Sequence, residues 1–176
     1  SGCSCGTRRS AARSPRSEPA ADVHVPLRPA HRALILRLLE RTPEFRPDEV
    51  AVALELVDAA LAGGTDYRFV VEEGAEGALV GYACFGATPM TEGTFDLCWI
   101  VVEPGAKRGG VGRRLLERVE AELRRDGARL LRVETEGGDA YAATRGFYQR
   151  VGYEVLATIR DFYAVGRDLV IFGRYL

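Results

Sequence analysis

The sequence has no apolar run long enough to cross a membrane and almost no excess of charge. A membrane-spanning helix needs roughly 20 consecutive apolar residues, and the 176 residues contain no such stretch. The beginning of the chain also lacks the charged and then apolar pattern of a secretory signal peptide. The formal net charge is −1, which gives no general attraction to nucleic acid. We therefore expect a cytoplasmic protein that binds neither membranes nor nucleic acids.

Cysteine is too scarce and too scattered to form a metal site. Cys3 and Cys5 make a Cys-x-Cys pair, but the sequence has no second pair and no histidine near it, as a zinc site requires. Cys84 and Cys98 lie in apolar segments, and we expect both to be reduced core residues. The sequence therefore predicts no bound metal.

The remaining composition is that of one folded domain with a tail. Hydrophobic residues make up 47% of the chain and charged residues 28%, as in ordinary globular proteins. Residues 1–21 contain no large apolar side chain and several arginines, so we expect a disordered basic tail. Residues 22–176 contain no linker and no internal repeat, so we expect a single domain. Lys107 is the only lysine, a bias that indicates a GC-rich bacterial genome.

The spacing of apolar residues predicts strands and helices in the order β-α-α-β-β-β-α-β-α-β-β. One helix starts after Arg46-Pro47-Asp48, with proline in its first turn, and stops at Gly63 and Gly64. The expected strands cover about residues 23–27, 67–71, 78–86, 94–102, 130–135, 153–160 and 169–175. This order indicates an α/β fold.

The most informative stretch joins the strand that ends at Val102 to an amphipathic helix through a basic, glycine-rich turn. Glycines let the backbone approach a ligand closely, and the free N–H groups at a helix start favour an anion such as phosphate. The glycines are Gly109, Gly110 and Gly112. The basic residues, whose charge has the right sign, are Lys107, Arg108, Arg113 and Arg114. The alternative is a flexible loop whose arginines are merely solvated.

The spacing Lys107-x-x-Gly110-x-Gly112 resembles the acetyl-CoA signature of the GNAT superfamily of N-acetyltransferases. The later segment RGFYQRVGY, residues 145–153, is similar to a second motif of the same family. The resemblance implies a central mixed, mostly antiparallel sheet flanked by helices over residues 22–176. It also implies direct transfer of an acetyl group from acetyl-CoA to a primary amine of a small molecule or peptide. Lys107 stands where the family usually has arginine or glutamine. A lysine keeps the positive charge of arginine but lacks its planar guanidinium fork.

The resemblance implies which residues hold the coenzyme. In the family, the amides of the turn hold the pyrophosphate, and the preceding strand binds the pantetheine arm like an added strand. Tyr141 stands where members often carry an asparagine that helps to hold this arm. The expected coenzyme-binding residues are Ile100, Val101, Val102, Lys107, Arg108, Gly109, Gly110, Val111, Gly112, Arg113, Tyr141 and Tyr148.

The implied reaction needs a proton donor and a proton acceptor. An alkyl amine has a pKa of about 10.4 and must lose a proton to attack, whereas the leaving thiolate, comparable to a thiol of pKa about 8.5, gains from receiving one. Tyr148 occupies the tyrosine position that lies near the thioester sulfur in the family, which makes it the expected donor. The alternative is that Tyr148 forms an aromatic core pair with Phe147.

Asp96 is the expected proton acceptor. The histone-type members of the family carry an acidic residue at this position of the motif strand, whereas both histidines lie far upstream. The alternatives are a solvated carboxylate at Asp96, Glu134 on the next strand, or ordered water. We expect the first two helices and the segment 161–168 to select the acceptor. That segment could seat a cationic or cyclic amine, or could form a packed hairpin turn.

A second class of function stays open. A GNAT-like domain could bind acyl-CoA without catalysis, as a sensor or an assembly module. A nucleotide-binding P-loop is disfavoured, because no Gly-Lys-Ser/Thr follows the glycines. The sequence leaves open a homodimer formed through the last strands.

Overall fold

The computed structural model describes residues 23–176, in which strands and helices follow one another in the predicted order. The expectation for residues 1–21 lies outside the described residues. The strands are β1 (Val23–Val25), β2 (Arg68–Glu73), β3 (Leu79–Ala87), β4 (Thr94–Val102), β5 (Leu130–Glu136), β6 (Glu154–Ala164) and β7 (Arg167–Tyr175). The α-helices are α1 (His31–Glu40), α2 (Pro47–Leu61), α3 (Val111–Arg125) and α4 (Ala142–Arg150).

The strands form one mixed sheet in the order β1-β2-β3-β4-β5-β7-β6. Every neighbouring pair is antiparallel except β4 and β5, which are parallel. Parallel neighbours need a crossover connection, and α3 supplies it. The predicted mixed, mostly antiparallel sheet flanked by helices is confirmed.

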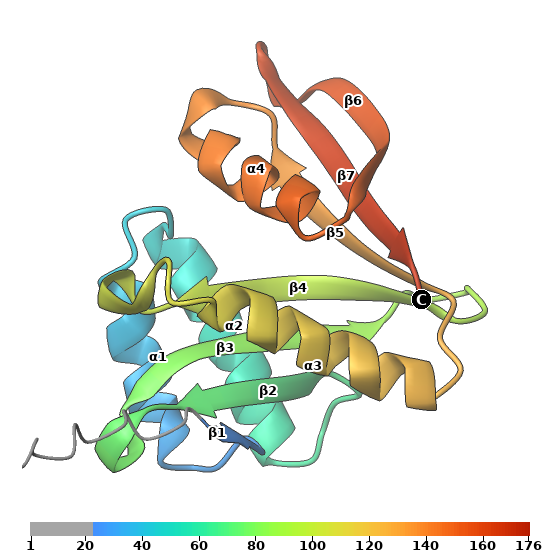
Figure 1. Cartoon of the computed structure of the whole chain (residues 1–176). Coiled ribbons are helices and arrows are strands. Elements are labelled where there is room, and N and C mark those ends of the chain that lie inside the picture. Colours follow the sequence, from blue (N-terminus) through green and yellow to red (C-terminus); the bar gives the residue numbers. More distant parts are fainter. Residues whose placement is uncertain (1–22) are drawn as a thin grey trace, which may run out of the picture.

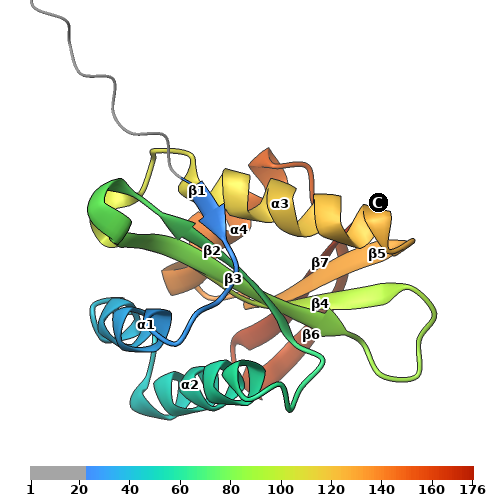
Figure 2. The same cartoon turned by 90° about the horizontal axis from the view of Figure 1, so that it is seen from below.

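Helices cover both faces of the sheet, with α1 and α2 on one face and α3 on the other (Figure 2). The spacing predicted for α3 is confirmed, because Leu115, Val119 and Leu123 are fully buried against the sheet. On the opposite face, Ile35 of α1 and Val57 of α2 are fully buried in a second apolar cluster. The sheet is therefore packed on both sides, and α3 holds its crossover firmly against β2, β3 and β4.

Gly81 of β3 allows α3 to approach the sheet closely. A Cβ atom at this position would lie 2.8 Å from the Val101 carbonyl oxygen and 3.0 Å from the Leu115 side chain. Since the carbonyl is backbone, a larger residue here would push the start of α3 away from β4. The close contact fixes where the amino end of α3 lies.

Within residues 23–176, no helix has the length and apolarity of a membrane span.

The last hairpin differs from the prediction, because β6 and β7 extend into the segment expected to be a loop. The pairs Ile159 with Leu169 and Ala164 with Arg167 leave residues 160–163 opposite a single residue of β7. This wide bulge is held by Asp161, whose φ is +55° and whose carboxylate accepts a hydrogen bond from the Gly166 N–H at 2.6 Å. The spacing of apolar residues does not reveal such a bulge, since the inserted residues break the two-residue period.

Candidate functional site

The sheet opens between β4 and β5. These strands pair only over Thr94–Asp96 and Leu130–Arg132, and beyond this point they diverge (Figure 1). A bulge lies on β4 at the start of the divergence, because Cys98 is skipped between its neighbours in the register with β3. Bulges bend a strand and increase its twist. Over the rest of β4 and β5, the facing edges have no strand partner across the gap, so their N–H and C=O groups are available to a ligand.

The glycine-rich turn lies at the open end of β4, immediately before α3. Gly110 has a φ of +78°, in the left-handed region that favours glycine, and it caps the helix. The first helical hydrogen bond runs from the Arg114 N–H to the Gly110 carbonyl at 3.0 Å. The preceding amides of residues 111–113 therefore lack helical acceptors, and the positive end of the helix dipole lies with them. This geometry favours an anion, as the sequence predicts.

The four basic side chains of the turn have different roles in the structure. Lys107 is half exposed beside Glu44, with 3.5 Å between Nζ and Oε1, and Arg108 forms no ion pair within residues 23–176. Arg113 points along the helix to Glu117, with 2.8 Å between Nε and Oε1. Arg114 is directed to β2 and is described below. Lys107 and Arg108 are therefore the cations best placed to meet an anion at the turn.

Phe147 and Tyr148 join α4 to the turn and to the core. A Cβ atom at Gly112 would lie 3.4 Å from the Phe147 ring, so the start of α3 and α4 are in contact. Tyr148 is only 2% exposed and packs against Phe147 and Phe172, with ring centroids 5.2 and 5.8 Å away. Burial raises the pKa of the Tyr148 phenol, which therefore stays protonated. No side-chain hydrogen bond within the described residues contributes to that shift.

Asp96, Arg132 and Glu134 form a chain of charges at the base of the opening. The neighbouring residues in sequence face the α3 core, so alternation places these three side chains on the α1 and α2 face. Arg132 pairs with Oδ1 of Asp96, and its Nη1 lies 3.0 Å from Oε1 of Glu134. The Thr88 hydroxyl donates to the other Asp96 oxygen at 2.8 Å. Both oxygens of Asp96 are thus engaged.

The structure leaves more of the Glu134 carboxylate open. Its Oε2 atom has no hydrogen-bond partner among residues 23–176, and the side chain is 43% exposed. Sequence reasoning named both carboxylates but missed Arg132, which bridges them. Its alternation with Glu134 on β5 was a signal, although the pairing of β5 with β4 could not be read from the chain.

A second wall of the opening comes from the last hairpin and the start of α4. Arg167 of β7 donates from Nε to Glu136 of β5 at 2.9 Å. Burial and the negative charges of Glu134 and Glu136 raise the pKa of Tyr163. Burial and the charges of Glu49 and Glu136 likewise raise the pKa of Tyr141. The segment 161–168 is thus a hairpin, and its expected role in seating an amine stays a prediction.

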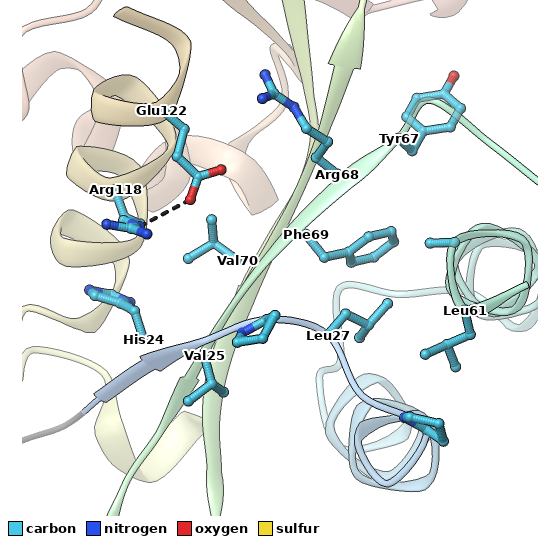
Figure 3. A pocket seen from close by; sticks show the side chains of 13 residues that line it. His24, Val25, Leu27, Leu61, Tyr67, Arg68, Phe69, Val70, Arg118 and Glu122 are labelled. Carbon is cyan, nitrogen blue, oxygen red and sulfur yellow. Dashed lines mark hydrogen bonds and ion pairs between the residues drawn. The ribbon is translucent and has the colours of Figure 1, made fainter. Parts of the chain in front are cut away.

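A separate hollow of about 540 Å³ lies at the β1 and β2 edge of the sheet (Figure 3). Apolar side chains, Leu27, Leu61 and Phe69, line one part, and His24 and Arg118 are among the polar lining residues. None of the predicted catalytic or coenzyme-binding residues lines it. Strand β3 separates this edge from the opening, so the hollow is not part of the predicted site.

Comparison with known proteins gives the same picture as the geometry. Residues 65–155 match the family model of the acetyltransferase (GNAT) domain. The chain is 42% identical over 131 residues to mycothiol acetyltransferase of Geodermatophilus obscurus, a match that covers 70% of this chain but 40% of that protein. It is 36% identical over 135 residues to blasticidin-S acetyltransferase of Streptomyces morookaense, covering 74% and 81% of the two chains. A GNAT-family structure from Desulfovibrio desulfuricans superimposes with a TM-score of 0.85 and 41% identity, covering 88% of this chain and 99% of that one.

Proposed function

Because the chain belongs to the GNAT family of acetyltransferases, we propose that it transfers the acetyl group of acetyl-CoA directly to an amine. The observation that carries the proposal is the opening between β4 and β5, with the free amides of α3 at its end. The two curated relatives are named for different acceptors, mycothiol and blasticidin S. The acceptor of this chain is therefore not inferred from either name.

The residues of the opening suit acetyl-CoA. The free edge of β4 at Ile100, Val101 and Val102 offers backbone groups to the amides of the pantetheine arm. The amides of Gly110 through Arg113, with Lys107 and Arg108 beside them, offer donors and positive charge to the pyrophosphate. Tyr141 borders the same opening. Acetyl-CoA supplies an acetyl group activated as a thioester, and the chain supplies the binding and the proton transfers.

We assign proton donation to Tyr148. Its raised pKa keeps the phenol protonated at neutral and moderately alkaline pH, which a donor to the leaving thiolate needs. Burial is the sole cause of the shift, with no side-chain hydrogen bond to the phenol among the described residues, so the hydroxyl is available to donate. The aromatic packing with Phe147, which the sequence offered as the alternative, is present, and it would also fix the orientation of the phenol.

We assign proton acceptance to the pair Asp96 and Glu134, bridged by Arg132. Glu134 has the open oxygen and the greater exposure, so it is the member that takes the proton, through a water molecule. Asp96 holds the Arg132 guanidinium from the other side and accepts a hydrogen bond from the Thr88 hydroxyl. The acidic end of β5 would also attract a protonated amine before it loses its proton.

The two carboxylates can be separated by substitution. Glu134→Gln is expected to lower kcat/KM for the amine about tenfold near pH 7, because the proton acceptor is lost. The loss is expected to be smaller near pH 10, where much of the ammonium has already lost its proton to solvent. Asp96→Asn is expected to cause a smaller loss at both values of pH. The measurement is a pH profile of both variants. A larger loss in Asp96→Asn would make Asp96 the proton acceptor, and loss in neither would assign the role to water alone.

The function is tested by release of the coenzyme A thiol and by calorimetric binding of coenzyme A. The acceptors are a panel of simple amines, polyamines, aminoglycosides, amino acids and peptides. Amine-dependent release supports an N-acetyltransferase. Binding without release from any member of the panel would replace catalysis by a sensing or assembly role, and absence of binding would overturn the coenzyme site.

The coenzyme site has its own matched variants. Lys107→Glu combined with Arg108→Glu is expected to raise the Kd for coenzyme A at least about tenfold, because two attractive charges become repulsive. Arg125→Glu, at the other end of α3, is the control and is expected to leave the Kd unchanged. Equal Kd values for all three proteins would contradict the assignment of the pyrophosphate to the turn.

A further inference from the structure

Glu72 is a fully buried carboxylate that the proposed reaction does not use. It lies near the end of β2, one residue before Glu73, with 0% exposure. Arg114 of α3 contacts it through two nitrogens, of which Nε lies 3.0 Å from Oε1. On the other side, Nδ1 of His24 lies 3.7 Å from Oε2. Burying a carboxylate is costly unless a cation compensates for it, so the Arg114 guanidinium is strongly held in this place.

The same guanidinium also contacts the glycine-rich turn. Nη1 of Arg114 donates a hydrogen bond to the Gly109 carbonyl oxygen at 2.8 Å. One rigid, planar group therefore links a buried charge on β2 to the backbone of the turn. A lysine could not make both contacts in this way, because its ammonium is a point charge rather than a fork.

The contact determines how the next amide is directed. In a trans peptide, the carbonyl of one residue and the N–H of the following residue point in opposite directions. Fixing the Gly109 carbonyl against Arg114 therefore also fixes the Gly110 N–H, which lies in the same peptide plane and points in the opposite direction. Gly110 lies in the left-handed region at φ +78°, where a glycine turn has alternatives unless something holds it.

We infer that Glu72 is a positioning residue, which acts through Arg114 to hold the glycine-rich turn in the conformation that receives the pyrophosphate. The inference rests on the proposed function, since it assumes that coenzyme A binds at the turn. It changes the role of Arg114 from the one expected from sequence. The Arg114 side chain supports the turn through the Gly109 carbonyl, and Glu72 neutralises its charge.

The test measures the Kd for coenzyme A, which needs no knowledge of the acceptor. Glu72→Gln and Arg114→Gln are each expected to raise the Kd about tenfold, the scale of one hydrogen bond to a charged group. The double variant is expected to match Arg114→Gln alone, because Glu72 acts through that side chain. At saturating acetyl-CoA, kcat is expected to stay within about twofold of wild type, since the brace affects binding rather than chemistry.

A matched control separates positioning from stability. Glu120 is also a buried carboxylate on the α3 side, 3% exposed, and pairs with Arg124 at 3.1 Å, but it lies away from the turn. Glu120→Gln is expected to lower the thermal midpoint as Glu72→Gln does while leaving the Kd unchanged. Should Glu72→Gln fail to fold, Arg114→Lys is the second variant. The Arg114 side chain is 37% exposed, and a lysine there can keep the ion pair with Glu72 but not both contacts.

The outcomes distinguish the two proposals. If wild type does not bind coenzyme A, the coenzyme site itself is wrong. If wild type binds but the Glu72 and Arg114 variants bind equally well, the coenzyme site stands and the positioning role is wrong. Additive losses in the double variant, or an equal loss of affinity in Glu120→Gln, would also overturn the positioning role.

Discussion

Replacing Tyr148 with phenylalanine is expected to lower kcat about a hundredfold while leaving the Kd for coenzyme A within about twofold. Proton transfer by a positioned side chain contributes roughly 10²–10⁴-fold to a rate. The substitution removes only the hydroxyl, so the aromatic contacts with Phe147 and Phe172 remain. The measurement is single-turnover and steady-state thiol release, with coenzyme binding measured on the same preparations. Full turnover by the variant would show that the donor lies elsewhere.

Tyr153 provides the control for this experiment. It is 3% exposed, lies 5.7 Å from Tyr148 between ring centroids, and donates its hydroxyl to Glu120 at 3.1 Å. Tyr153→Phe therefore removes a buried hydroxyl from the same aromatic cluster but on its structural side. We expect a loss of stability with kcat retained. Similar losses of kcat in both variants would indicate disturbed packing rather than a lost proton donor.

The free energy of unfolding is expected to fall steeply above pH 10, by roughly 4 kcal/mol per pH unit. Three tyrosines are nearly inaccessible, namely Tyr82 at 0%, Tyr148 at 2% and Tyr153 at 3% exposure. Burial raises the pKa of each phenol above its ordinary value. Above pH 10 these groups ionise in the unfolded chain but stay protonated in the folded one. The unfolded state then binds fewer protons, so stability decreases as pH rises.

Urea unfolding between pH 8 and pH 11 measures this dependence. The stabilising contribution of the three phenols is complete below pH 10, where both states are protonated, and it is lost as the pH rises toward the folded-state pKa values. Tyr82→Phe is expected to reduce the slope by about one third, because each group contributes about 1.4 kcal/mol per pH unit. A flat stability up to pH 11 would contradict the burial of these hydroxyls.

The sequence predicts the order of elements well, because apolar spacing and turn residues are local signals. The amphipathic face of α3 and the proline start of α2 are both found as expected. The prediction is least accurate at residues 161–168, where a bulge extends both strands. A bulge inserts residues without a change of composition, so the spacing does not reveal it.

The sequence predicts the candidate site less completely, since much of it depends on contacts between distant segments. The glycine-rich turn is a contiguous motif and is found where expected. The ion pair of Arg114 with Glu72 joins α3 to β2, and that of Arg132 with Asp96 joins β5 to β4. Such pairs require the sheet order and register, which spacing along one chain does not provide. The assignments of Tyr148, Asp96 and the coenzyme-binding residues remain predictions.

The parallel pairing of β4 with β5 spans only three residues on each strand. In the sequence, α3 lies between these two strands. The strands on either side of it are joined by local antiparallel pairing, β2-β3-β4 in one group and β6-β7 in the other. Contacts between neighbouring segments form faster, whereas a parallel pair loses more chain entropy because its long crossover must be closed first. The two halves of the sheet are thus expected to form first and to join last. The opening between β4 and β5 lies at that junction, so we expect it to be the part of the sheet that is completed latest and that opens most readily.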